Sequence, residues 1–320
     1  MSGLVLASVA ASGGLPVGRA RLIHAAWSEA RRIGARFVLA VDDTSSTARQ
    51  GSPLEDLAWL GLEWDTQVLR SEQVARYVAA AEALEAAGRL YPCFEHADEL
   101  RAKAERQRKQ GRPIVYDRAM LRLTAAQRLA AEAGGKRAHW RFRLSNHVMS
   151  WPDARAGRCE VALPTLSDPV LRDEDGSVDP VLALAADDVA LGATHLVSGA
   201  EMMAVTAVHL DLLAALGAET AKVLVHLPAP AEEAGRRVQA QSMRAMRADG
   251  VAPAGLRAWF ESLSRAKAPR ARIADLLAAN RGVLAQTPFA EVAHLLPGID
   301  EAGWLARRGA IDLINEARAE

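Results

Sequence analysis

The sequence predicts an α/β fold built around a parallel sheet, and three observations lead to that prediction. An apolar run over 3–10 ends at a turn that contains paired glycines, and an amphipathic helix follows over 18–33. A second apolar run, RFVLAVDD, comes directly after that helix and ends in two carboxylates. The same alternation returns later at PVLALAADDV, ATHLVSG and KVLVHLP. Strands and helices that alternate through short turns form right-handed parallel units.

The remaining elements are read from helix start and stop signals. Ser52 is an N-cap candidate, and Pro53 follows it in the first helical position. A further amphipathic helix is predicted over 71–88, ending at Gly88. The stretch MMAVTAVHLDLLAALG predicts a long helix, KVLVHLP a last strand, and the chain from 236 onward several short helices.

Composition shifts divide the chain into four predicted parts. Residues 1–90 and 179–235 form the two halves of the sheet domain, 91–178 form an insertion, and 236–320 form a helical region. The insertion is rich in arginine, proline and glycine, and it contains the short strand-like pieces HWRFRLS and CEVALPTL.

Composition also excludes several classes of protein. Half of the 320 residues are apolar and 39 basic residues balance 39 acidic ones, so a nucleic acid would need a local basic patch. Two cysteines exclude a disulfide framework and a four-cysteine zinc site. The eight histidines lack metal-ligand spacing, so we expect no metal and no zinc. The N-terminal apolar run fits a buried strand better than a signal peptide, and we expect a cytoplasmic protein with no membrane partner.

The turn after the first strand is a candidate nucleotide site. Gly13, Gly14, Gly18 and Arg19 surround a predicted helix N-terminus, where backbone N–H groups can hold a phosphate. Their spacing matches neither the dinucleotide fingerprint nor the P-loop, so a purely structural turn is the competing interpretation.

Two acidic pairs are candidates for a substrate pocket. Asp42 and Asp43 follow a parallel strand at the edge where such sheets bind ligands, but neighbouring strand residues point to opposite faces. Asp187 and Asp188 suggest the same role, with helix capping as the alternative. Cys93 is expected to be a core residue rather than a reactive one.

Basic residues gather in the insertion, in the stretch RAKAERQRKQGR. They can follow phosphates or form the solvated face of a helix. The RNA-contact candidates are Arg101, Lys103, Arg106, Arg108, Lys109 and Arg112.

Several segments together resemble the bacterial glutamyl-tRNA synthetases in order and spacing. The segments are RFVLAVDDT, LEDLAWLGLEWD, AAEALEAAGRLYPCF, GRPIVYDRAMLRLT, HWRFRL, LSDPVLRDEDGS, DDVALGATHLVSGAEMMAVTAVHLDLLAALGA and SMRAMRADGVAPAGLRAWFESL. The resemblance implies a class I nucleotide-binding core of Rossmann type, an inserted domain that meets the tRNA acceptor end, and a helical stem-contact region. It implies ATP and tRNA as ligands, and we expect no anticodon-binding region before the chain stops at Glu320.

The departures from the family fall on its ATP signatures. PVGR stands in place of the HIGH motif, so Pro16 replaces the histidine that is directed at the phosphates. The loop matching KLSKR is shorter, and only Arg236 and Arg237 can replace its lysine charge. The catalytic residues therefore stay unassigned.

The glutamate pocket departs from the family as well. Leu6 and Ala10 replace an arginine and a serine, Asp42 replaces a glutamate, and Ser198 replaces a second arginine. Pro180 stands where a tyrosine is usual, while Asp187 and Asp188 keep two acids and Ala200 replaces a glutamate. Of the zinc cysteines of some relatives, only Cys93 is present.

Three functions follow from this comparison. The first is a pseudo-synthetase that no longer activates glutamate with ATP and instead binds an RNA or a protein partner. The second is a nucleotidyl-transfer enzyme whose site is rebuilt for another small molecule around Asp42, Asp188, Arg236 and Arg237. The third is residual transfer of glutamate to tRNA.

Overall fold

The computed structural model describes residues 3–44, 51–218, 222–232 and 238–318. Contacts divide the chain into two compact units. The first unit comprises residues 1–71, 195–201 and 225–320, and the second comprises 72–194 and 202–224. The domain boundaries expected from composition stay a prediction.

A parallel sheet forms the centre of the first unit, as the sequence predicts. Its strand order is β3-β2-β1-β9, and every neighbouring pair runs in parallel. The strands are β1 (Leu4–Ala10), β2 (Arg36–Asp42), β3 (Thr66–Leu69) and β9 (His195–Gly199). Because the strands are parallel, the residues after β1, β2 and β3 come together at one edge.

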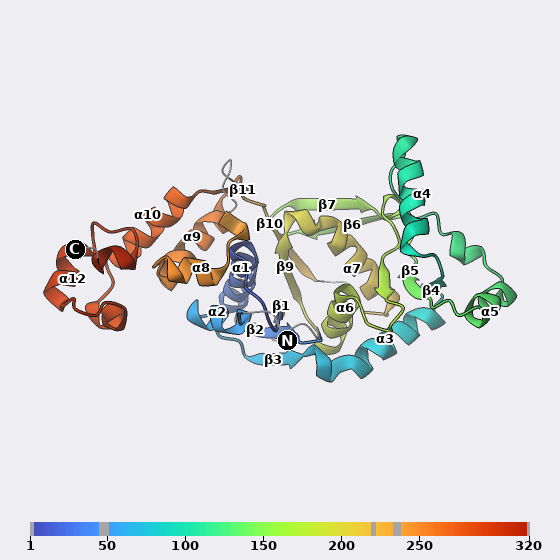
Figure 1. The fold of residues 1–320 in the computed structure, drawn as a ribbon, viewed down its shortest axis with the longest axis horizontal. Coiled ribbons are helices and arrows are strands. Elements are labelled where there is room, and N and C mark those ends of the chain that lie inside the picture. Colours follow the sequence, from blue (N-terminus) through green and yellow to red (C-terminus); the bar gives the residue numbers. More distant parts are fainter. Residues whose placement is uncertain (1–2, 45–50, 219–221, 233–237, 319–320) are drawn as a thin grey trace. The chain divides into compact units, whose positions relative to one another are not determined.

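Helix α1 (Val17–Ile33) crosses from β1 to β2 and packs on the sheet (Figure 1). It begins one residue before the predicted start and ends at Gly34, whose φ of 65° is the left-handed value that favours glycine. Helix α2 (Pro53–Trp59) has the predicted N-cap, because Ser52 Oγ accepts a hydrogen bond from Glu55 N–H at 3.3 Å. One apolar core joins α1, the sheet and the first of the helices that follow residue 242.

Those later helices are α8 (Met243–Ala248), α9 (Pro253–Arg265), α10 (Ile273–Leu284), α11 (Phe289–Val292) and α12 (Glu301–Arg307). Trp304 is fully buried in a separate core cluster of this region. The expectation of an entirely helical region is wrong in one detail: β12 (Arg270–Ala271) pairs in parallel with β11 (Ala231–Glu232). Two residues are too short to give a periodic sequence signal.

The second unit contains two sets of strands. One is a sheet of order β4-β5-β8, formed by β4 (Leu90–Cys93), β5 (His139–Phe142) and β8 (Val170–Arg172). The other is a hairpin of β6 (Val148–Asp153) and β7 (Gly157–Ala162), in which Asp153 pairs with Leu224 of β10 (Val223–Leu227). The two strand-like pieces of the insertion therefore belong to different sheets.

Five helices complete the described part of the second unit. They are α3 (Val74–Ala86), α4 (Ala97–Lys109), α5 (Ala125–Ala133), α6 (Pro180–Leu191) and α7 (Met203–Ala215). The helix predicted from 71 begins instead as a 3₁₀ turn, Arg70–Gln73, before α3. Gly88 follows α3 with a φ of 64°, in agreement with the predicted end. Within the described residues, no helix combines the length and apolar character that a membrane span requires.

Candidate nucleotide and substrate site

The turn between β1 and α1 is built on a close approach of two backbone segments. Gly13 has a φ of 100° and Gly51 a φ of 105°, both in the region that favours glycine. Gly13 N–H donates to the carbonyl oxygen of Gly51 at 3.2 Å. A Cβ on Gly51 would lie 3.0 Å from the carbonyl oxygen of Gly13. Both glycines are therefore required by the contact between the two segments.

The chain over 239–243 covers the N-terminal turn of α1. Val17 N–H donates to the carbonyl oxygen of Gln241 at 2.8 Å, and Met243 N–H donates to that of Leu15 at 2.8 Å. Pro16 forms an antiparallel bridge with Ser242. The first N–H group of the helix is therefore bonded to the protein's own backbone.

Two of the predicted nucleotide-binding glycines contact this same segment. A Cβ on Gly18 would lie 3.2 Å from Cβ of Gln239, and one on Gly14 would lie 3.4 Å from Cβ of Ser242. Glycines in a phosphate-binding turn allow a ligand to approach the backbone. Here they allow the approach of residues 239–242.

Glu232 anchors the covering segment from its N-terminal side. Its two carboxylate oxygens accept hydrogen bonds from Val238 N–H and Gln239 N–H, each at 3.0 Å. The side-chain amide of Gln239 donates to the carbonyl oxygen of Pro230 at 3.2 Å. Arg236 and Arg237, proposed above as nucleotide-binding residues, lie outside the described residues.

Asp42 ends β2, and hydrogen bonds occupy both of its carboxylate oxygens. Oδ1 accepts from Thr44 Oγ1 at 2.7 Å and from Thr44 N–H at 3.3 Å, and Oδ2 pairs with Arg70 Nη1 at 2.7 Å. Burial raises the pKa of Asp42, but the hydrogen bonds from Thr44 and the charge of Arg70 outweigh it and lower that pKa overall. Asp42 is therefore an ionised, paired carboxylate.

Asp43 follows the last residue of β2, and its carboxylate has different partners from that of Asp42. Its carboxylate accepts from Ser71 N–H at 2.9 Å and from Ser71 Oγ at 2.6 Å. These bonds fix the 3₁₀ turn after β3, and Arg70 is the first residue of that turn. Asp43 thereby positions the partner of Asp42.

Arg19 lies on the same edge of the sheet. Its Nη2 donates to the carbonyl oxygen of Ser8 at 2.6 Å and to Ser8 Oγ at 3.0 Å. Desolvation and the positive charge of Arg70 both lower the pKa of the Arg19 guanidinium. The structure therefore brings Ser8, Arg19, Asp42 and Arg70 together, and two of these, Ser8 and Arg70, are not among the residues predicted from sequence. Arg70 could have been found, because it directly follows β3 at the ligand-binding edge.

The other pocket candidates are apolar or uncharged. Leu6 is buried within β1, Ala10 is exposed at its end, and Ser198 is half-buried on β9. Pro180 occupies the first position of α6, in the second unit. None of the four side chains carries a positive charge, so none can form an ion pair with a carboxylate. These positions do not provide the cations expected in a glutamate pocket.

Asp187 and Asp188 lie inside the second unit, in the last turns of α6, and both are buried. Asp187 pairs with Arg76 Nη1 at 2.7 Å and accepts from Tyr77 Oη at 3.0 Å. Asp188 lies 2.6 Å from His209 Nε2 and 3.4 Å from Lys222 Nζ. The helix-capping alternative is wrong, because Asp179 caps α6. As pocket residues they stay a prediction, and a ligand would have to displace buried partners.

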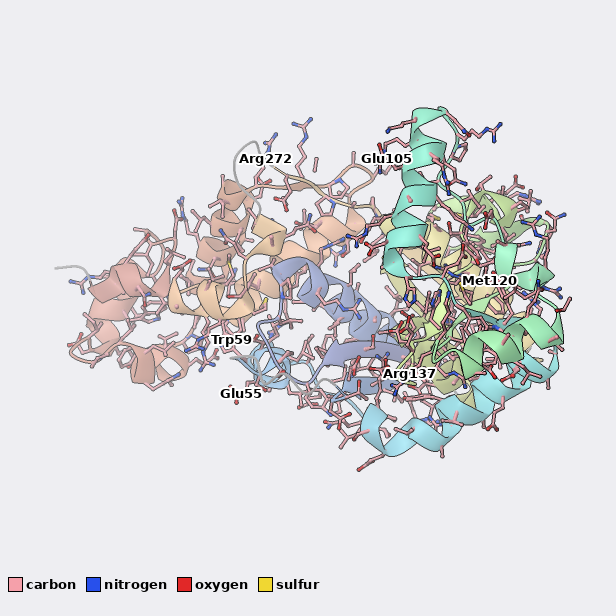
Figure 2. The ribbon with its side chains drawn as sticks, turned by 45° about the vertical axis from the view of Figure 1, so that its right-hand side comes forward. Glu55, Trp59, Glu105, Met120, Arg137 and Arg272 are labelled. Atoms are coloured by element: carbon pink, nitrogen blue, oxygen red, sulfur yellow. The ribbon has the colours of Figure 1, made fainter. Side chains whose placement is uncertain are left out.

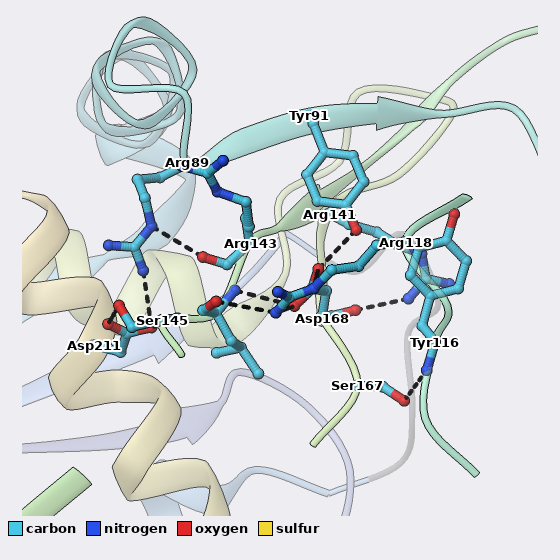
Figure 3. A network of polar contacts seen from close by, with 11 residues as sticks. Arg89, Tyr91, Tyr116, Arg118, Arg141, Arg143, Ser145, Ser167, Asp168 and Asp211 are labelled. Atoms are coloured by element: carbon cyan, nitrogen blue, oxygen red, sulfur yellow. Dashed lines mark hydrogen bonds and ion pairs between the residues drawn. The ribbon is translucent and has the colours of Figure 1, made fainter. Parts of the chain in front are cut away.

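A polar network in the second unit was not predicted from sequence (Figure 3). Asp168 accepts from Arg118 Nε at 2.9 Å, Arg118 Nη2 at 2.8 Å and Tyr91 Oη at 2.8 Å. Asp211 accepts from Arg89 Nη2 at 2.8 Å and from Ser145 Oγ at 2.7 Å. These buried acids hold the strands of the insertion to the helices and connecting segments around them.

The six RNA-contact candidates differ in their surroundings. Arg101 pairs with Asp98, Arg108 with Glu105, and Lys103 with both Glu95 and Asp117. Among the described residues, no acidic partner is found for Arg106, Lys109 and Arg112. Figure 2 shows the side chains that project from α4, with Glu105 labelled. Arg106 and Arg112 line a groove of about 460 Å³ together with Tyr116 and Arg141.

Cys93 is buried as predicted. Its Sγ lies 3.4 Å from Tyr116 Oη and 3.7 Å from Glu95 Oε2. Glu95 in turn pairs with the ammonium group of Lys103. Within the described residues, no three histidine, cysteine or acidic side chains are placed to hold a metal.

The parallel sheet with its inserted unit and the site at the strand ends define a class I tRNA synthetase catalytic domain. Residues 9–245 match the family model described as "tRNA synthetases class I (E and Q), catalytic domain", and the chain belongs to this family. Within this family, the chain is similar to the ligases for glutamate. It is 39% identical over 339 residues to "Glutamate--tRNA ligase 2" of Gluconacetobacter diazotrophicus, covering 96% of this chain and 76% of that protein.

Other comparisons agree with this placement. The glutamate–tRNA ligase 2 of Acidiphilium cryptum is 41% identical over 339 residues, covering 96% of this chain and 76% of its own. The solved glutamate tRNA ligase of Elizabethkingia meningosepticum has a TM-score of 0.80 at 17% identity, covering 99% of this chain and 79% of its own. At that identity the structural likeness establishes the fold alone.

Proposed function

We propose that this member of the glutamate–tRNA ligase family binds RNA and does not activate glutamate with ATP. One observation carries the proposal: the segment over 239–243 is bonded to the N-terminal turn of α1, where an ATP signature would stand. Val17 N–H is bonded to Gln241, and the face of Gly18 is in contact with Gln239. A phosphate at this position would have to displace both contacts.

The chemistry of activation supports the same conclusion. The transferring phosphate needs preorganised donors and cations, and the loss of one such donor costs about 3 to 4 kcal/mol, roughly 100- to 1000-fold in rate. Pro16 carries no side-chain donor at the position of the family's histidine. Losses of this kind are not additive, but they act in the same direction.

The amino-acid side of the site supports it as well. An α-ammonium group needs an available carboxylate, and Arg70 and Thr44 already occupy both oxygens of Asp42. A substrate carboxylate needs a cation, and Leu6 and Ser198 provide none. A bound glutamate would therefore lack a free carboxylate for its ammonium group and a cation for its carboxylate.

RNA binding is assigned to the second unit, on α4 and the segment after it. Arg106, Lys109 and Arg112 carry charges that no described acid neutralises, whereas Arg101, Lys103 and Arg108 are paired. Unpaired surface cations release counterions when they meet phosphates, and this gives affinity that depends on salt. The groove beside Arg106 and Arg112 offers the RNA a concave surface.

Two double variants of equal charge test the RNA assignment. R106Q/R112Q removes unpaired cations, and the matched control R101Q/R108Q removes paired ones from the same region. Binding of labelled bacterial tRNA should weaken in R106Q/R112Q, and the slope of log affinity against log salt should fall by about 1.5. The control should change both quantities less. Equal effects in the two variants, or no binding by the unaltered protein, would refute RNA as the ligand and leave a protein partner as the alternative.

A further inference from the structure

Two guanidinium groups, those of Arg19 and Arg70, lie at the carboxyl edge of β1 and β2. Arg70 pairs with Asp42, and the neighbouring carboxylate of Asp43 is bonded to the turn that carries Arg70. The positive charge of Arg70 lowers the pKa of both Asp42 and Arg19. Arg19 has no carboxylate partner among the described residues, so its charge is the one available to a ligand.

Both guanidinium groups have donors that the described protein does not use. Arg19 is exposed, and its Nη2 makes both bonds to Ser8, so Nε and Nη1 have no partner among the described residues. The Nε of Arg70 is buried with no hydrogen-bond partner, although Nη1 pairs with Asp42. Buried donors are nearly always hydrogen-bonded, so one without a partner points to a water, ion or ligand that binds there.

The local structure holds these donors in place. Ser8 fixes the guanidinium of Arg19 through two bonds, and Asp43 fixes the turn that carries Arg70 through Ser71. The planar donor fork of arginine matches the oxygens of a carboxylate or phosphate, and it cannot accept a hydrogen bond from an ammonium. The donors are thus preorganised for an oxyanion.

We infer that this edge binds the oxyanion group of a small molecule, a phosphate or a carboxylate, through Arg19 and Arg70. The inference rests on the proposed absence of glutamate activation, because Asp42 is here a partner of Arg70 and not a receiver of the substrate's amino group. The site has become anion-binding at the place where the family resemblance implies an ammonium. The guanidinium of Arg19 makes the site favour a negatively charged ligand over a positively charged one.

Calorimetric titration with inorganic phosphate at constant ionic strength tests the inference, with succinate as a second arm to separate the two oxyanions. The unaltered protein should bind at least one of them saturably. R19Q should weaken that binding by about tenfold or more, because charge-assisted hydrogen bonds contribute about 1.5 to 3 kcal/mol each. R19K should retain part of the affinity, because it keeps the charge and loses the fork.

The matched control is R32Q, which removes an exposed cation from the same helix, where Arg32 pairs with Glu29. It should leave phosphate and succinate binding unchanged. The absence of saturable binding in both arms, or equal weakening by R19Q and R32Q, would overturn the inference. Such a result would leave the proposed function standing, because that function is refuted by the tRNA-binding test or by glutamate-dependent ATP–pyrophosphate exchange and by neither oxyanion titration.

Discussion

The carbonyl oxygen of Gln241 lies 2.8 Å from the backbone nitrogen of Val17 and accepts its hydrogen bond. Val17 is the first residue of α1, and the N–H groups of a helix N-terminus are the part of the helix that binds phosphate. In this chain the partner of that N–H is another part of the same unit. Pro16, which the family resemblance places at the ATP histidine, and the contact between Val17 and Gln241 therefore lie at one place.

Restoring the missing histidine should not restore activity. In P16H the new imidazole would stand beside a turn still closed by residues 239–243, and Leu6 and Ser198 would still lack cations for glutamate. We expect no charging of tRNA by this variant above that of the unaltered protein. Measurable charging by P16H in an acylation assay with labelled glutamate would show that the single side chain, and not the closed turn, limits the chemistry.

Arg118 should reveal the cost of its backbone conformation. Its φ of 55° is unusual for a residue other than glycine, and its guanidinium makes two bonds to the buried Asp168. R118A should lower the free energy of unfolding by about 3 kcal/mol, because Asp168 loses its charged partner. R118G loses the same pair but relieves left-handed strain, so it should be about 0.5 to 1 kcal/mol more stable than R118A.

Urea denaturation measures both of these variants. R158A removes an exposed pair with Glu160 and should change stability by less than about 1 kcal/mol. If R118A proved as stable as R158A, the Arg118–Asp168 pair would have no structural role. If R118G proved less stable than R118A, the strain at this position would be disproved.

His24 should make the first unit sensitive to acid. It is buried beside Trp27 and Phe260, and burial together with the charge of Arg257 lowers its pKa from 6.5 to about 4. The unfolded chain binds a proton near pH 6.5 and the folded chain does not, so this contribution is complete above pH 6.5 and is lost as the pH falls toward 4. The loss amounts to about 3 kcal/mol.

The contribution is isolated by comparing the unaltered protein with H24L. Carboxylates also titrate in this range, but they are common to both proteins, so the difference in unfolding free energy between pH 7 and pH 4 reports His24. The unaltered protein should lose more stability than H24L over that interval. H294Q, which replaces an exposed histidine, should behave like the unaltered protein. Parallel pH profiles for the unaltered protein and H24L would contradict the assignment.

Local sequence signals predicted the individual helices and strands better than they predicted which strands pair in a sheet. The β1–α1–β2 unit, the Ser52 cap and the glycine end of α3 are encoded by local sequence, and all are found. The pairing of β6 with β10 joins Asp153 to Leu224, and no local pattern specifies such a contact. The strand pieces were therefore recognisable, whereas their sheets were not.

The candidate site shows the same division. Asp42 was recognised because it ends a parallel strand, but its pairing with Arg70 depends on the turn after a third strand. Asp187 and Asp188 were singled out as an acidic pair, yet their partners are set by packing against α3 and α7, and Asp187 joins Arg76 from 111 positions away. The contact of residues 239–243 with the α1 turn joins segments still further apart in the sequence. These relationships exist only once the chain has folded.

Glutamate-dependent ATP–pyrophosphate exchange, run with and without tRNA, shows whether this chain activates glutamate. The glutamate–tRNA ligase 2 of Gluconacetobacter diazotrophicus is the comparison protein, because it is 39% identical over 96% of this chain. We predict that this chain gives no exchange above a protein-free control in either condition. Exchange that depends on added glutamate would contradict the account and establish residual glutamyl activation in its place.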